Sequence, residues 1–138
     1  MAPFSTRGPR KQASMKKILL GFLAFITLAA FTALSGLDDV IGALRAGNAS
    51  ELAKYIDDNV EITLPEKSDR YSRAQATAVL QDFFNNRGVK SFELKHKGDN
   101  GGSQFAIGTL QTRAGAFRTT VYMTTRNGRQ LVREIRFQ

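Results

Sequence analysis

The fold is decided by residues 116–137, which read Ala-Phe-Arg-Thr-Thr-Val-Tyr-Met-Thr-Thr-Arg-Asn-Gly-Arg-Gln-Leu-Val-Arg-Glu-Ile-Arg-Phe. Two runs rich in β-branched and aromatic residues lie on either side of Asn127 and Gly128. An Asn-Gly pair is the preferred tight turn of a β-hairpin because both positions need positive φ. This stretch therefore predicts two antiparallel strands, at residues 116–125 and 131–137.

Two more strands are predicted before this hairpin. Apolar and polar side chains alternate along residues 91–97, and residues 103–113 form a second run. Residues 98–102 read Gly-Asp-Asn-Gly-Gly, a composition that reverses the chain. Four consecutive strands joined by short reversals indicate an antiparallel meander.

Two short helices are predicted ahead of the meander. The first has apolar residues at a spacing of three and four, and Gly47 ends it as a left-handed cap. Asn48 and Glu51 form a variant capping box that opens the second helix, in which Tyr55 and Ile56 face inward. The apolar stripe of the first helix consists of Leu37, Val40, Ile41 and Leu44.

A strand and a longer helix complete the pattern. Residues 60–64 alternate as a half-buried strand that Pro65 stops, and residues 66–71 read as a polar loop. Residues 72–75 form a capping box for the third helix, which Gly88 ends. Its wide apolar stripe consists of Ala76, Val79, Leu80, Phe83 and Phe84. Helices on one face of an antiparallel sheet place the chain in the α+β class.

Three segments carry a resemblance to known proteins: residues 38–48, residues 81–84 (Gln-Asp-Phe-Phe) and residues 132–137 (Val-Arg-Glu-Ile-Arg-Phe). With this order of elements, they resemble the nuclear-transport-factor-2-like (cystatin-like) superfamily. They are similar to an exported bacterial family within it, domain of unknown function 4783. The resemblance implies a strongly bent sheet wrapped around about three helices to form a cone. Its motifs are packing motifs, so it implies no catalytic residue.

Residues 1–35 have the pattern of a secretory signal. An uncharged run at residues 18–37 follows five basic residues, and Ala33-Leu34-Ser35 supplies a small-x-small cleavage pattern before Gly36. We therefore expect residues 1–35 to be removed on export and residues 36–138 to form one domain in the periplasm or cell envelope. The basic residues are Arg7, Arg10, Lys11, Lys16 and Lys17.

Two alternatives for this segment stay open. About 20 uncharged residues are enough to cross a bilayer, so the segment could remain as an inner-membrane anchor with the domain outside. Only in that case would the protein contact the membrane. Met15 also opens a compact signal by itself, so residues 1–14 could reflect a misassigned start.

The charge of the chain argues against nucleic-acid binding. The whole sequence has 20 basic and 12 acidic residues, but residues 36–138 have 15 basic and 12 acidic. This excess is small for a surface that neutralises phosphates. The charge is uneven, because residues 36–86 have five basic and nine acidic residues while residues 87–138 have ten and three.

The chemical inventory predicts no cofactor and no metal site. The sequence has one histidine and no cysteine, which excludes a thiolate site or a cysteine nucleophile. Asp57, Asp58 and Glu61 lack the repeated oxygen ligands of a calcium loop, and we interpret them as solvated carboxylates at a helix end.

Four residues are candidates for a pocket inside the cone: His96, Arg133, Tyr55 and Phe105. Strand alternation points His96 inward with Phe92, and Arg133 inward with Ile135. A buried arginine needs a carboxylate partner or an anionic ligand. For the aromatic residues, core packing is the competing interpretation.

A polar face on one strand is a candidate subunit interface. Its residues, Arg118, Thr120, Tyr122 and Thr124, alternate with apolar ones. Sheet faces pair in many members of the superfamily, so the resemblance favours a homodimer through the sheet.

The function we predict is an exported, noncatalytic binding or assembly module. Its partners would be a second copy of the chain and an envelope protein or a small apolar or anionic ligand. One alternative is an isomerase or hydrolase that uses the cone interior, with His96, Arg133 and a carboxylate. Another is an accessory domain anchored in the inner membrane.

Overall fold

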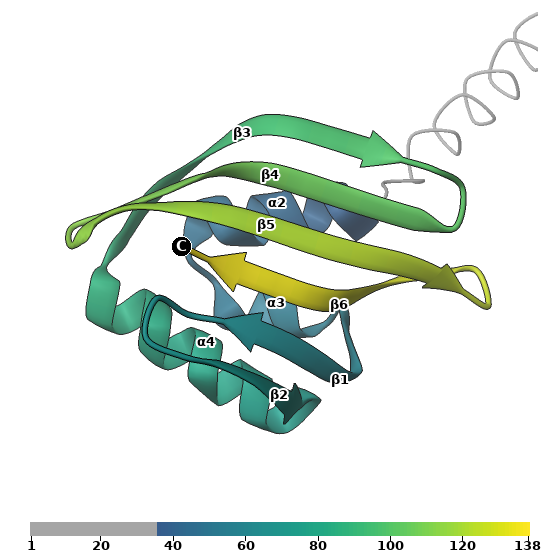
Figure 1. Ribbon diagram of the computed structural model, residues 1–138, viewed down its shortest axis with the longest axis horizontal. Helices are drawn as coiled ribbons and strands as arrows, with labels where there is room; N and C mark the ends of the chain where they lie inside the picture. The colour runs from purple at the N-terminus through teal and green to yellow at the C-terminus, as the bar shows by residue number, and fades with distance from the viewer. Residues whose placement is uncertain (1–35) are drawn as a thin grey trace, which may run out of the picture. The chain divides into compact units, whose positions relative to one another are not determined.

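A computed structural model of the chain describes residues 36–138, so the predicted signal segment lies outside the described residues. Two helices come first in this part of the chain, and two strands, a longer helix and four consecutive strands follow (Figure 1). The elements are α2 (Gly36–Ala46), α3 (Ala49–Ala53), β1 (Ile56–Thr63), β2 (Ser68–Ser72), α4 (Arg73–Arg87), β3 (Val89–Asp99), β4 (Ser103–Thr112), β5 (Gly115–Arg126) and β6 (Arg129–Phe137).

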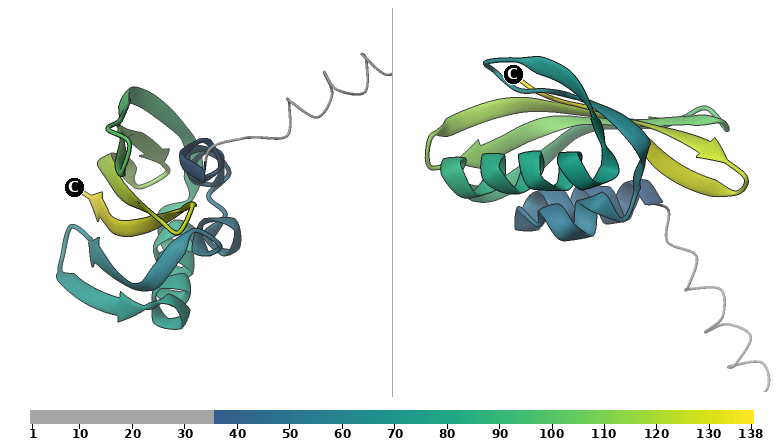
Figure 2. Two further views of the ribbon diagram at one scale, coloured as in Figure 1. Left: turned by 90° about the vertical axis from the view of Figure 1, so that its right-hand side faces the viewer. Right: turned by 90° about the horizontal axis from the view of Figure 1, so that it is seen from below.

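All the strands of residues 36–138 form one curved sheet, in the order β2-β1-β6-β5-β4-β3. Strands β3 to β6 are the predicted antiparallel meander, and β1 joins β6 as its parallel neighbour. The helices lie on one face of the sheet, as Figure 2 shows. The α+β prediction is confirmed. Within these residues, none of the helices is both long enough and apolar enough to cross a bilayer.

The polar loop predicted at residues 66–71 was wrong in part, because Ser68–Ser72 forms strand β2. This strand pairs with β1 from Asn59 opposite Ser72 to Thr63 opposite Ser68. It lies at the sheet edge and is exposed or half-buried throughout. Main-chain hydrogen bonds hold such an edge strand, so its side chains need no apolar alternation.

The second helix is also shorter than predicted. It starts as expected, with the Asn48 side chain accepting a hydrogen bond from Glu51 N, but it ends at Ala53. Ile56 belongs to β1 instead. Val132 N of β6 donates a hydrogen bond to Tyr55 O at 2.6 Å. Because this bond pairs Tyr55 with the sheet, the helix cannot continue to Ile56.

Helix α4 matches its prediction closely. Both hydrogen bonds of the capping box between Ser72 and Gln75 are present, and Gly88 ends the helix with a φ of 72°. Residues with a side chain at this φ are strained, which explains the glycine. The helix buries Phe83 and Phe84 against the sheet.

Aromatic rings fill the space between α4 and the sheet. Phe83 stacks on Phe137 of β6, with ring centroids 4.6 Å apart, and meets Phe117 of β5 edge-on at 5.5 Å. Phe84 meets Phe137 edge-on at 6.0 Å. Phe137 is fully buried, so the interior at this end of the cone is a packed core.

Replacing Phe137 tests which face of the sheet is buried against the helices. We expect Phe137→Ala to lower the free energy of unfolding by about 3–5 kcal/mol, because it removes a fully buried ring. Phe105→Ala, on the half-buried opposite face, should cost about 1 kcal/mol. Urea unfolding followed by circular dichroism measures both. Equal losses for the two variants would mean that the buried face is assigned incorrectly.

Candidate functional site

A β-bulge moves His96 away from the cone interior. Strand β3 pairs Leu94 with Gly108 and then His96 with Ile107, so Lys95 is an extra residue. One extra residue reverses the alternation of side chains beyond it. His96 is exposed on the face of the sheet opposite the helices, which we call the outer face. The prediction that it points inward was wrong.

Phe105 lies beside His96 on the outer face. The two ring centroids are 5.4 Å apart, and Phe105 is half-buried. Its ring covers Gly98 of β3, where an added Cβ would come within 2.3 Å of a ring carbon. Because glycine has no side chain, an aromatic ring from the neighbouring strand can fill the space that a side chain would occupy. Phe105 thus covers the outer surface of the sheet and does not line the cone interior.

Arg133 lies at a second β-bulge, in strand β6. Tyr122 pairs with Glu134 and Met123 pairs with Val132, so Arg133 is the extra residue of β6. Its side chain is 50% exposed, and Arg133 Nε lies 3.8 Å from Asp57 Oδ2. The inward orientation predicted for Arg133 was therefore wrong.

The carboxylates near the start of β1 do not share one environment. Asp57 is buried, with 6% of its surface exposed, and Arg126 Nη2 lies 2.9 Å from its Oδ1. Asp58 is exposed and Glu61 is half-buried. The interpretation of Asp57 as a solvated helix-end carboxylate was wrong, because it belongs to β1 and an arginine pairs with it.

Tyr55 lies on the helical side of the domain. Its hydroxyl donates a 2.5 Å hydrogen bond to Asp39 Oδ2 of α2. This bond raises the pKa of the Tyr55 hydroxyl above its ordinary value, and burial raises it further. Of the four pocket candidates, the structure brings together only His96 and Phe105, and it does so outside the cone.

The interface candidates do share one face, the outer face of β5. Tyr122 is 41% exposed and is the one large hydrophobic residue exposed among residues 36–138. Arg118 is also exposed, whereas Thr124 is half-buried and Thr120 is buried. Their role in an interface stays a prediction.

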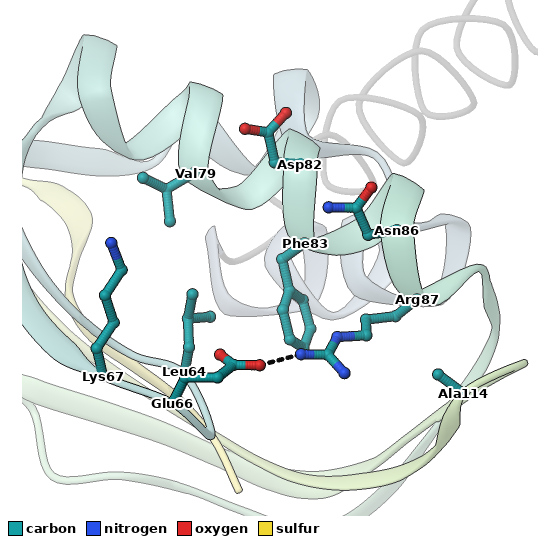
Figure 3. Close-up of a pocket in the computed structure, with 9 residues that line it drawn as sticks. All are labelled: Leu64, Glu66, Lys67, Val79, Asp82, Phe83, Asn86, Arg87 and Ala114. Carbon is teal, nitrogen blue, oxygen red and sulfur yellow. Dashed lines mark hydrogen bonds and ion pairs between the residues drawn. The ribbon is translucent and has the colours of Figure 1, made fainter.

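A pocket of about 390 Å³ lies beside α4, and we call it the α4 pocket (Figure 3). One face of α4 supplies residues at a helical spacing of three and four, as expected for neighbours on a helix. The loop after β1 forms the opposite wall, and the turn between β4 and β5 contributes Ala114. The lining consists of Leu64, Glu66, Lys67, Val79, Asp82, Phe83, Asn86, Arg87 and Ala114.

Arg87 connects the α4 pocket to the aromatic core. Its guanidinium lies 5.5 Å from the ring centroids of both Phe83 and Phe117 and forms an ion pair with Glu66. The dashed line in Figure 3 marks this ion pair, which joins α4 to the loop after β1. Cation–π contact and ion pairing together fix the guanidinium at one end of the pocket.

The lining combines apolar side chains with charges of both signs. Leu64, Val79 and Phe83 are apolar, while Lys67 and Asp82 are exposed. Such a pocket can bind a ligand or a peptide segment that has an apolar part and charged groups. Sequence reasoning missed it, although the polar residues of α4 lie at a helical spacing beside the apolar stripe. Among residues 36–138, no cluster of three or more potential metal ligands is found.

Comparison with known proteins identifies the family. A family model described as Domain of unknown function (DUF4783) matches residues 37–138. A crystal structure of a DUF4783 family protein from Bacteroides uniformis is 34% identical, with a TM-score of 0.71, and the match covers 73% of this chain and 94% of that one. For a DUF4783 family protein from Bacteroides ovatus, the identity is 34%, the TM-score 0.69 and the coverage 72% and 90%.

A more distant structure shares the fold alone. A nuclear-transport-factor-2-like protein of unknown function from Cytophaga hutchinsonii is 10% identical with a TM-score of 0.56, covering 78% of this chain and 92% of that one. The search of curated proteins found no match. The chain therefore belongs to the DUF4783 family, and its domain has the nuclear-transport-factor-2-like fold.

Proposed function

We propose that the protein is an exported, noncatalytic binding or assembly module that acts as a homodimer in the periplasm or cell envelope. The observation that carries this proposal is the packed aromatic interior, where Phe83 stacks on Phe137. An enzyme of the isomerase or hydrolase kind needs titratable groups that converge inside a closed cavity. Here His96 and Arg133 lie outside the cone.

The α4 pocket is the ligand site in this proposal. Its apolar side chains, Leu64, Val79 and Phe83, would hold an apolar group of the ligand. Lys67 and Asp82 have no ion pair within residues 36–138, so an ammonium and a carboxylate remain available for charged groups. A partner segment with an apolar side chain between opposite charges fits this lining.

The second copy of the chain would dock on the outer face of β5. Tyr122 is an aromatic residue with a polar end, a type enriched at protein interfaces. It pairs with Phe105 on one side and with Glu134 on the other. Glu134 forms an ion pair with Arg136, so charges of both signs lie next to the aromatic residues. Such a face is complementary to a rotated copy of itself.

A charge placed at Tyr122 tests the dimer. We expect the protein to sediment as a dimer and Tyr122→Lys to sediment as a monomer, because lysine is depleted at interface cores. Gln81→Lys adds the same charge at an exposed position on α4, on the helical side, and should remain dimeric. A monomeric wild-type protein, or a dimer that survives Tyr122→Lys unchanged, would exclude this interface.

Export and ligand binding are tested together by native mass spectrometry of the protein recovered from the periplasm. We expect a mature chain that begins at Gly36, because the small-x-small pattern precedes it. A copurifying small molecule or protein that Asp82→Lys removes would support the α4 pocket. A full-length chain in the membrane fraction would contradict cleavage, and a bound molecule unaffected by Asp82→Lys would place the site elsewhere.

A further inference from the structure

Irregular pairing between β1 and β6 opens a second, strongly polar pocket. The two strands pair at Ile56 and Val132 and next at Glu61 and Glu134, so residues 57–60 face the single extra residue Arg133. Bulges of this kind re-aim side chains and are frequent beside functional sites. The resulting pocket has a volume of about 200 Å³ and is lined by Asp57, Asp58, Asn59, Arg70, Arg126 and Arg133.

Three arginines from three strands line this pocket: Arg70 of β2, Arg126 of β5 and Arg133 of β6. The buried carboxylate of Asp57 accepts hydrogen bonds from Arg126 Nη2 at 2.9 Å and from Asp58 N at 2.8 Å. One carboxylate group therefore holds Arg126 in place but cannot neutralise three guanidinium groups.

The other two arginines keep most of their donors unused. Arg133 Nε lies 3.8 Å from Asp57 Oδ2, which is beyond hydrogen-bond distance. The Arg70 side chain forms no hydrogen bond or ion pair with any of residues 36–138. Each guanidinium has five N–H donors in a planar fork, so the pocket offers many donors for an acceptor-rich ligand.

The second carboxylate of the pocket, Asp58, does not remove the excess of positive charge, because another arginine pairs with it. Arg73 of α4 lies 3.3 Å from Asp58 Oδ1, and Arg73 Nε also donates to Ile56 O at 3.0 Å. The pocket lining contains three arginines and two aspartates, which leaves an excess of one positive charge. Three guanidinium groups lining one pocket repel each other, and a bound anion would relieve that repulsion.

We propose that this pocket binds a phosphoryl group, the dianionic end of a phosphate monoester. A phosphoryl group has three terminal oxygens that accept hydrogen bonds from guanidinium forks. These oxygens supply more acceptors for the unused guanidinium donors than a monocarboxylate does. The pocket's small volume fits the charged end of a ligand better than a whole cofactor. The site is separate from the α4 pocket and does not depend on the proposed dimer.

Isothermal titration calorimetry of the full-length protein tests this site, with inorganic phosphate, glycerol 3-phosphate and acetate at constant ionic strength. We expect both phosphates to bind and Arg70→Gln or Arg133→Gln to weaken them at least about tenfold, because each variant removes charge-assisted hydrogen bonds. Arg45→Gln removes the same charge at an exposed position of α2 and should change the affinity less than about twofold.

Three results would overturn the proposal: no saturable phosphate binding, acetate binding as tight as phosphate binding, or an equal loss in Arg45→Gln and Arg70→Gln. Circular dichroism of each variant verifies folding, and exposed Arg70 keeps the test valid if Arg133→Gln does not fold. Vesicles with and without phosphatidic acid identify the source of the group. Binding to phosphatidic acid would indicate a lipid headgroup, and inert vesicles with bound glycerol 3-phosphate would indicate a soluble ester.

Discussion

The stack of Phe83 on Phe137 is the contact on which the other features depend, because it joins α4 to a central strand of the sheet. Phe137 is fully buried near the end of β6, and Phe117 of β5 meets the same Phe83 ring. The rings hold the curved sheet against the helix and occupy the interior. Arg87 lies over two of these rings, so the geometry of the α4 pocket follows from the same packing.

Because the interior is packed, we place the proposed binding sites on the surface of the domain. The α4 pocket, the outer face of β5 and the arginine-lined pocket at the β1–β6 bulge use different sets of residues. Only the arginine-lined pocket depends on an irregular pairing, because a regular helix and a regular strand supply most of the other two sets of residues. In the proposed function, the cone acts as a support, and its loops, one bulge and its outer face supply the binding groups.

The sequence predicted those parts of the fold that depend on local chemistry. The Asn127-Gly128 turn has φ values of 53° and 74°, as an Asn-Gly hairpin requires, and the Ser72 capping box is present. The orientations of His96 and Arg133 could not be predicted, because His96 follows a bulge that reverses strand alternation and Arg133 is itself the extra residue of a bulge. Strand β2 escaped detection because an exposed edge strand carries no apolar pattern.

Aromatic nuclear Overhauser spectroscopy on protein with isotope-labelled phenylalanine tests the packed interior most directly. A packed interior predicts strong cross-peaks between the Phe83 and Phe137 rings, whose centroids lie 4.6 Å apart, and no cross-peak from the fully buried Phe137 ring to water. Missing ring-to-ring cross-peaks, with contacts to water instead, would reveal an open cavity. That result would contradict the packed core and restore an enzyme site inside the cone as an explanation.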